Sequence, residues 1–390
     1  MARLLLNPHR DPGFRTAAPG REPLDLHRRL PGYAPTPLGS APGLAARCGI
    51  RKVLVKDESS RLGLPAFKVL GAWWATYRAL AGRLGRSPEP WSTVAELRDR
   101  LQPALPAALA AATDGNHGRA VARVARVLGI GARIFVPRGT AAPRIQGIAA
   151  EGAQVTEVDG TYDATVERAA AEQGSGALLI QDQWLPGYGE VPAWISDGYA
   201  TLFWEAEEQL AARGEPAPDL VLVQIGVGAL AGAAVRHFRR EELVRPPLLV
   251  GVEPTRAACA LASLEAGRLV TLPVGADASI MAGLNCGTPS AAAWPLLRAG
   301  LDAVIAVEDE PARDAMRLLA ADGIPSGESG AAGAAGLLEL LAGTGAVARE
   351  RLGIGGEARA LLLSTEGATD PEAYRRIVGK APEAVGPHAG

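Results

Sequence analysis

Lysine is scarce in this chain of 390 residues, because only four of its 40 basic residues are lysine and the rest are arginine. Arginine does not lose its proton to act as an amine nucleophile, so amine chemistry here has to use one of four side chains. Cysteine is scarce too: the three cysteines are far apart and not spaced as metal ligands. We therefore expect reduced thiols, a cytoplasmic protein and no metal site.

The sequence also has little excess charge and no long apolar runs. Its net charge is -2 and its charged fraction is 21%. No basic cluster alternates with aromatic residues, and no apolar run reaches the length of a membrane span, so we expect no nucleic-acid partner and no membrane segment. The five histidines show no zinc-binding spacing. The hydrophobic fraction of 48% predicts a globular protein with more than one domain.

Strand and helix patterns alternate through most of the chain. A first series of short apolar segments is predicted as strands at 107–112, 132–136, 153–158 and 177–180. After a tryptophan-bearing stretch at 184–204, a second series follows at 219–224, 248–252, 303–307 and 360–363. Helical patterns separate these strands, which is typical of parallel sheets.

We therefore predict an α/β protein with two doubly wound parallel-sheet domains. The large domain would combine residues 1–84 with 189–390, and the small domain would span 85–188. Within the large domain, residues 1 to about 50 are rich in Pro, Gly and Arg and are expected to form an extended arm, followed by a strand at 51–56.

Lys68 is the lysine with the most distinctive surroundings. It follows a Gly-Leu-Pro-Ala-Phe turn and precedes an apolar run at 69–75 that predicts the start of a buried helix. Burial disfavours a charged amine and lowers its pKa, which suits a lysine that forms a Schiff base. On this stretch alone, the better explanation is a lysine whose stem packs while its ammonium reaches water. The rest of the chain reverses this preference.

A glycine-rich loop at 226–232 ends a predicted strand and opens a helix. Backbone amides at such a helix start bind anions, including phosphate groups. Gly226, Gly228 and Ala231 also fit the dinucleotide pattern G-x-G-x-x-A, and Glu253 follows near the spacing of a ribose-binding acid. The loop alone therefore leaves a dinucleotide-dependent oxidoreductase open.

Further polar clusters accompany the ends of predicted strands or the starts of helices. They lie at 113–118, 181–188, 326–330 and 364–370. Open α/β sheets bind ligands at the carboxyl ends of their strands. A helix cap formed by Asp114 or Asn116 would explain the first cluster alone, but capping is a poor explanation for four clusters and a lysine.

Together these stretches resemble the diaminopropionate ammonia-lyase family. That family belongs to the fold-type II pyridoxal-phosphate enzymes, with the serine/threonine dehydratases and the tryptophan synthase β subunit. The matching segments are 57–59, 66–68, 113–118, 226–232, 279–284, 326–330 and 364–367. The glycine loop is general to the superfamily, whereas Thr-Asp-Gly-Asn-His-Gly and Ser-Thr-Glu-Gly are much narrower.

The resemblance implies pyridoxal 5′-phosphate as the cofactor, held by Lys68 as a Schiff base. Asn116 would hydrogen-bond the 3′-oxygen of the ring, and Ser364 or Thr365 would meet the pyridine nitrogen. The phosphate would be bound by the loop residues Gly226, Val227, Gly228, Ala229 and Leu230.

The implied reaction is the α,β-elimination of 2,3-diaminopropionate, through an aminoacrylate, to pyruvate and ammonia. Asp114 and Asp182 match family carboxylates that serve the two enantiomers of this small amino acid as proton-abstracting or orienting groups. A carboxylate can bind the second ammonium of the substrate and take a proton. We also expect a homodimer. Departures from the family pattern at Leu62, Pro65 and Ala368 keep open a serine/threonine dehydratase or β-substituted alanine lyase.

Overall fold

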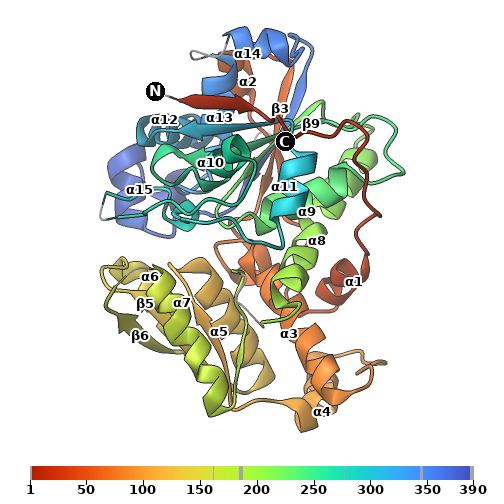
Figure 1. Ribbon diagram of the computed structural model, residues 1–390, viewed down its shortest axis with the longest axis vertical. Helices are drawn as coiled ribbons and strands as arrows, with labels where there is room; N and C mark the ends of the chain where they lie inside the picture. Colours follow the sequence, from red (N-terminus) through yellow and green to blue (C-terminus); the bar gives the residue numbers. More distant parts are fainter. Residues whose placement is uncertain (1, 161, 184–187, 276, 343–345, 387–390) are drawn as a thin grey trace. The chain divides into compact units, whose positions relative to one another are not determined.

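The computed structural model describes residues 2–160, 162–183, 188–275, 277–342 and 346–386 (Figure 1). The chain forms two compact units, of which unit 1 comprises Met1–Pro19, Pro35–Ser60 and Leu202–Gly390, and unit 2 comprises Gly20–Ala34 and Arg61–Thr201. Each unit is built on its own sheet, which confirms the predicted α/β class. All strands of the smaller sheet lie within 85–188, but the limits of the small domain stay a prediction.

The sheet of unit 1 has seven strands in the order β1-β10-β9-β8-β11-β3-β2. Their bounds are Arg3–Leu6 for β1, Leu38–Ser40 for β2, Lys52–Asp57 for β3, Leu220–Gln224 for β8, Leu248–Pro254 for β9, Ala303–Val307 for β10 and Arg359–Ser364 for β11. The inner strands pair in parallel, while β1 and β2 pair antiparallel at the edges. The prediction of an extended arm is therefore wrong for β1 and β2, since three or four residues are too few to show an alternating pattern.

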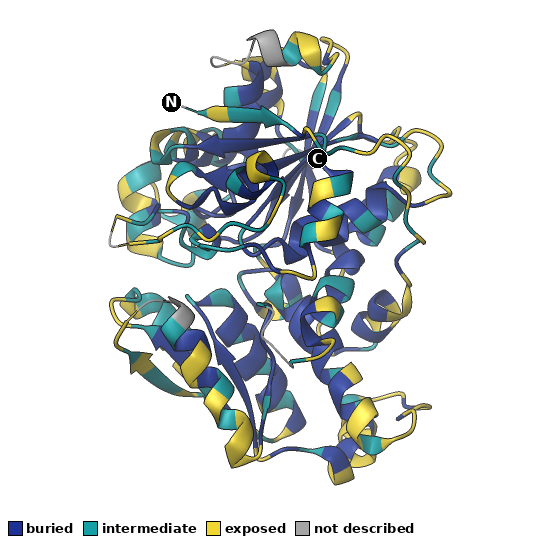
Figure 2. Ribbon diagram, viewed as in Figure 1, coloured by how far each residue is buried: buried dark blue, intermediate teal, exposed yellow. Residues whose placement is uncertain are grey.

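The core of unit 1 follows from the two-residue period of its strands. Alternate residues such as Val250 and Val252 point to one face, where they pack with buried residues of α2 (Pro42–Cys48), α12 (Asp309–Ala321) and α13 (Ala332–Leu341). Figure 2 shows these strands as buried along most of their length. Parallel strands buried on both faces are continuous apolar runs, which is why the sequence predicts them well.

Other helices complete unit 1. The helices α9 (Ala229–Phe238) and α10 (Cys259–Ala266) contact β9, and α11 (Trp294–Gly300) contacts α9. The remaining two are α14 (Ala346–Arg351) and α15 (Pro371–Val378). Because α9 begins directly after β8, the chain presents the amino end of α9 at the carboxyl edge of the sheet.

The sheet of unit 2 is parallel throughout, in the order β6-β5-β4-β7. Its strands are β4 (Ala108–Ala112), β5 (Gly131–Pro137), β6 (Gln154–Val158) and β7 (Ala177–Leu179), and its helices are α1 (Glu22–Arg28), α3 (Lys68–Leu84), α4 (Val94–Leu101), α5 (Asn116–Leu128), α6 (Ala142–Ala149) and α7 (Tyr162–Ala170). Small buried side chains along β4 let α5 and α7 pack against it. Because β4 and β7 are neighbours, the residues that follow them lie at the same sheet edge.

Helix α8 (Val191–Ala212) is the longest element that the sequence did not predict. The pattern of 184–204 showed only tryptophans, and 184–187 lie outside the described residues. Within α8, Ile195, Tyr199 and Phe203 are fully or almost fully buried, and apolar residues occur around most of the helix, so no polar face produces a period of 3.6. Neither α8 nor any other helix in the described ranges is long and apolar enough to cross a membrane.

The boundary between the two units falls within α8, whose residues up to Thr201 belong to unit 2 and whose residues from Leu202 belong to unit 1. A fully buried ion pair joins β3 to the part of α8 that belongs to unit 1. The Lys56 ammonium donates to Glu205 Oε2 at 2.7 Å, to the Thr36 carbonyl at 2.7 Å and to Gln209 Oε1 at 2.9 Å. Both charged side chains are 0% exposed. Every proton of this ammonium thus has an acceptor, as a buried charge requires.

Removing one partner of this pair should strongly destabilise the protein. We expect Glu205→Gln to lower the free energy of unfolding by about 3 to 5 kcal/mol, because it leaves the buried Lys56 charge uncompensated. Chemical denaturation of the full-length protein measures this change. The matched control is Glu357→Gln, which breaks an ion pair with Arg51 whose side chains are 56% and 86% exposed, and should cost less than about 1 kcal/mol. Equal losses in the two variants would contradict the prediction.

Candidate active site

Lys68 is the first residue of α3, at the helix end where the dipole disfavours a cation. Its Nζ donates to Asp182 Oδ2 at 2.9 Å, and the two side chains are 21% and 6% exposed. The carboxylate of Asp182 therefore compensates a charge that both the burial and the helix dipole oppose. Of the four lysines, this one pairs with a predicted site residue.

The pKa of Lys68 differs from the sequence prediction. Burial alone lowers the pKa of the amine, as expected, but the nearby groups Asp182, Tyr199 and Asp114 together raise it above its ordinary value. Burial likewise acts to raise the pKa of Asp182, yet the charged Lys68 amine beside it outweighs burial, and the pKa falls to about 2. The predicted low pKa is thus wrong for the amine in this form of the protein, because the sequence did not place a carboxylate beside it.

The turn between β4 and α5 is shaped by Thr113 and two glycines. The Thr113 hydroxyl accepts hydrogen bonds from the amides of Gly115 at 2.9 Å and Gly118 at 3.0 Å. A Cβ on Gly118 would lie 2.3 Å from Thr113 Cγ2, so only glycine fits there. The start of α5 is therefore held by Thr113, which weakens the interpretation of Asp114 or Asn116 as the cap.

The segment that carries Asp182 is fixed just after β7. Gln181 Oε1 accepts from the Ala112 amide at 2.9 Å, and the Gln181 amide donates to the Tyr188 hydroxyl at 2.6 Å. That hydroxyl donates in turn to the Leu179 carbonyl at 2.7 Å. Asp182 is thereby set beside the end of β4, in the same unit as Asp114 and Asn116.

His117 is a site residue to which the sequence analysis gave no role. Its Nε2 lies 2.7 Å from the Ile180 carbonyl, which can only accept, so Nε2 carries the proton. Burial lowers the pKa of this imidazole, which favours the neutral ring. Its Nδ1 has no hydrogen-bond partner among the described residues. The signal in the sequence that could have identified His117 is its position within the Thr-Asp-Gly-Asn-His-Gly motif at 113–118.

In unit 1 the glycine loop connects β8 to α9. Gly228 has φ +95°, and a Cβ there would lie 2.9 Å from Leu297 Cδ1. A Cβ on Gly226 would lie 3.1 Å from the Gly283 carbonyl oxygen. The amides of Val227, Gly228 and Leu230 donate no hydrogen bond within the described part of the chain. Unsatisfied amides at the start of a ten-residue helix fit a phosphate group.

The two polar clusters near the end of the chain pack together in unit 1. Ser364 Oγ donates to Ser326 Oγ at 2.9 Å, and the Ser329 amide donates to Glu366 Oε1 at 3.0 Å. Ser364 is 1% exposed and Thr365 is 5% exposed. The structure thus brings 326–330, which precedes α13, and 364–367, which follows β11, into one hydrogen-bonded group.

Glu253, the acid of the dinucleotide alternative, is fully buried at the end of β9. Its carboxylate accepts from the amides of Ala260 at 2.8 Å and Leu261 at 2.9 Å, at the start of α10. A side chain engaged in this way is not available to a ribose. The dinucleotide alternative therefore loses its acidic residue.

Glu253 also makes the stability of unit 1 dependent on pH. Burial raises its pKa from 4.5 to about 7, so the folded carboxyl keeps a proton that the unfolded one has lost. Stability should therefore fall as the pH rises from about 4.5 to about 7 and then level off. We expect the free energy of unfolding of wild type to fall by about 2 to 3 kcal/mol relative to Glu253→Gln across this window. A difference in the free energy of unfolding between wild type and Glu253→Gln that stays constant from pH 4 to 8 would contradict this prediction. The control is the exposed variant Glu357→Gln, whose difference from wild type should not show this fall.

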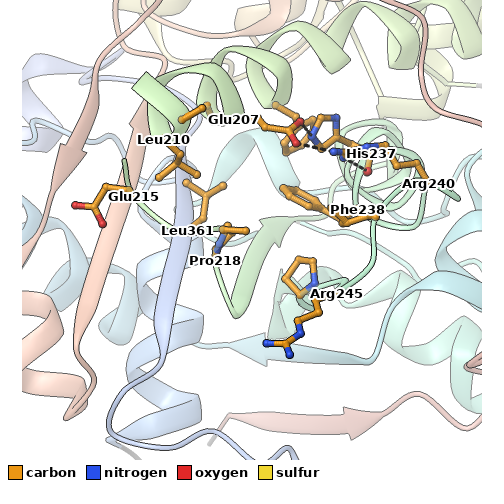
Figure 3. A pocket seen from close by; sticks show the side chains of 15 residues that line it. Glu207, Leu210, Glu215, Pro218, His237, Phe238, Arg240, Arg245 and Leu361 are labelled. Carbon is orange, nitrogen blue, oxygen red and sulfur yellow. Dashed lines mark hydrogen bonds and ion pairs between the residues drawn. The ribbon is translucent and has the colours of Figure 1, made fainter. Parts of the chain in front are cut away.

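A cavity of about 210 Å³ lies elsewhere in unit 1 (Figure 3). Apolar side chains including Leu210, Phe238 and Leu361 line it. At its wall Glu207 pairs with Arg240 at 2.6 Å and lies 3.3 Å from His237 Nε2. None of the predicted site residues lines this cavity.

The fold and the site together define a class of protein. A family model described as pyridoxal-phosphate dependent enzyme matches residues 29–354, and the chain belongs to this family. Within it, the chain is 38% identical over 373 residues to the diaminopropionate ammonia-lyase of Salmonella typhimurium, with 92% of this chain and 91% of the relative covered. The resemblance found in the motifs is thereby confirmed.

Solved structures agree. The crystal structure of the Escherichia coli diaminopropionate ammonia-lyase in complex with an aminoacrylate-PLP azomethine reaction intermediate matches with a TM-score of 0.87 and 35% identity, covering 97% of each chain. The biosynthetic L-threonine dehydratase of Mycobacterium leprae is more distant, at 28% identity over 80% of this chain and 66% of the relative. Similarity is thus greater to the ammonia-lyases than to this dehydratase.

Proposed function

We propose that this chain uses pyridoxal 5′-phosphate to eliminate ammonia from 2,3-diaminopropionate, giving pyruvate and a second ammonia. The observation that carries the proposal is the ion pair that joins Lys68 to a carboxylate of the predicted site. Asp182 binds the Lys68 amine at 2.9 Å, and the charge of Asp114 acts on the same amine. A substrate with two ammonium groups needs such acceptors.

The residues present fit the cofactor. In unit 1 the phosphate would be held by the loop of Gly226, Val227, Gly228, Ala229 and Leu230. Its Gly226 and Gly228 leave little room for a side chain, and the amides of Val227, Gly228 and Leu230 donate no hydrogen bond among the described residues. In unit 2, Lys68 supplies the only amine of the predicted site. When bound, the cofactor takes up the electrons released as the α-proton leaves the substrate.

The side chains of this chain would divide the remaining work. Lys68 attaches the cofactor and afterwards holds a proton on Nζ. Asn116 orients the ring through its 3′-oxygen, and Ser364 or Thr365 meets the ring nitrogen. The last two are buried hydroxyls, which can donate or accept but do not carry charge.

Asp114 and Asp182 would bind the second ammonium of the substrate and take the α-proton, each for one enantiomer. The Lys68 amine beside it lowers the pKa of Asp182, so this carboxylate is ionised while it pairs with that amine. An ionised carboxylate can both hold a cation and accept a proton, which explains two such groups in one site.

The alternative on the same scaffold is a serine/threonine dehydratase or a β-substituted alanine lyase. Those substrates lose a neutral or anionic group, for which a carboxylate offers no attraction. Comparing kcat/KM for 2,3-diaminopropionate, serine and threonine separates the two. A higher kcat/KM for serine or threonine than for either isomer of diaminopropionate would overturn the proposal.

Attachment of the cofactor is tested by spectroscopy. Purified protein with pyridoxal phosphate should absorb in the visible range, lose that band on borohydride reduction, and give a modified peptide containing Lys68. A colourless protein that gains no band from pyridoxal phosphate would contradict the proposed cofactor chemistry.

We also propose a homodimer located in the cytoplasm. Light scattering of the purified protein should then give twice the mass of the chain, and fractionated cells should carry the enzyme in the soluble fraction. A monomer, or activity in the membrane fraction, would contradict these two points separately.

A further inference from the structure

Tyr199 of α8 lies beside Lys68 within unit 2. Its ring centroid is 4.6 Å from that of Phe67, and the Lys68 Nζ is 5.9 Å from the Tyr199 ring centroid. We propose that Tyr199 is a positioning residue for the known chemistry of Lys68. Its hydroxyl is the second partner of the Lys68 amine, in addition to Asp182, and orients the nitrogen when the amine leaves that carboxylate.

A close crossing of α3 and α8 places the tyrosine. A Cβ on Gly71 would lie 2.6 Å from Tyr199 Cε1, and a Cβ on Gly198 would lie 2.6 Å from the Leu70 carbonyl oxygen. Both helices thus have a glycine where they meet, one turn after Lys68 and next to Tyr199. Without these glycines the ring would be displaced from the amine.

The Tyr199 hydroxyl is buried and makes no hydrogen bond to another described residue. The residue is 0% exposed, and its Oη has no hydrogen-bond partner among the described residues. Buried tyrosine hydroxyls normally find a partner. Tyr188 shows the usual case, because its hydroxyl both accepts from the Gln181 amide and donates to the Leu179 carbonyl. A hydroxyl without such a partner, next to an amine, has a hydrogen bond left to make.

The chemistry of Lys68 gives this hydroxyl a task. A lysine amine reacts with an aldehyde only when neutral: its lone pair forms the C–N bond, and the aldehyde oxygen leaves as water with the two amine protons. Asp182 favours the charged amine. Burial raises the pKa of the Tyr199 phenol, so it stays uncharged. A neutral hydroxyl can hold the neutral amine, which the carboxylate does not favour.

The test removes only this hydroxyl. Full-length wild type and Tyr199→Phe are freed of cofactor with hydroxylamine and mixed with pyridoxal phosphate, and the rate constant for covalent capture at Lys68 is followed by absorbance from pH 6 to 9. We expect Tyr199→Phe to capture the cofactor about tenfold more slowly at an unchanged melting temperature, as for the loss of a hydrogen bond to a charged or reacting group. The steepness of its pH dependence should also change.

The matched control is Tyr77→Phe, on α3 like Lys68, whose hydroxyl donates to the exposed Glu89 at 3.3 Å. This variant should capture the cofactor at the wild-type rate. Capture and pH dependence equal to wild type in Tyr199→Phe would overturn the inference, as would wild type that captures no cofactor. Cofactor capture needs no substrate, so the two claims can fail separately. If wild type captures the cofactor but does not release ammonia from diaminopropionate, the proposed function is contradicted and the inference about Tyr199 is not.

Discussion

Replacing Lys68 by alanine should abolish cofactor attachment and reduce ammonia release by at least about three orders of magnitude. The side chain is the one amine placed with Asp182, and no other group of the predicted site can form a Schiff base. The measurements are the visible absorbance of the purified variant and its kcat/KM on 2,3-diaminopropionate. A Lys68→Ala protein that eliminates ammonia at the wild-type rate would end this account.

Two further variants separate chemistry from stability. Lys68→Ala leaves the buried carboxylate of Asp182 without its partner, which by itself costs stability. Lys68→Arg keeps a positive charge beside Asp182 but supplies no amine, so it should fold and still be inactive. Lys52→Ala is the matched control for lysine loss. Lys52 lies on β3 and pairs with Glu215, so this variant should keep activity near the wild-type level.

The second prediction concerns the division of labour between Asp114 and Asp182. If each carboxylate serves one enantiomer, Asp114→Asn should reduce kcat/KM on one isomer of 2,3-diaminopropionate by about two to four orders of magnitude and spare the other. Asp182→Asn should show the opposite preference. The measurement is kcat/KM of both variants on the D and L isomers separately.

Other roles of these residues give different patterns. If Asp114 only stabilised the start of α5, its loss would cost about 1 kcal/mol of stability and affect both isomers alike. Because Asp182 favours the charged form of Lys68, which does not react with an aldehyde, its variant should in addition capture the cofactor faster at neutral pH. Asp159→Asn, in an exposed pair with Arg138, is the control and should affect neither isomer. Equal losses on both isomers in both variants would refute the division and leave Lys68 as the shared base.

The sequence by itself determined the elements with a strong local signal. The buried parallel strands are continuous apolar runs, so β4, β8, β9 and β10 were predicted within about two residues. The glycine loop also has a strong local signal, because positions such as Gly228 require a conformation and a space that only glycine has. The motif residues at 113–118 and 364–367 could be located because ligands bind at strand ends.

Only the tertiary structure decided the properties that depend on neighbours distant in sequence. Helix α8 has no amphipathic period because it is buried nearly all round, so its existence and the place of Tyr199 were invisible in the pattern. Lys68 and Asp182 are 114 residues apart, yet their contact reverses the direction of the lysine pKa. Glu253 likewise matched a ribose-binding position until its carboxylate was seen to hold the start of α10. Burial follows from composition, but charge compensation depends on which side chain the fold brings within about 3 Å.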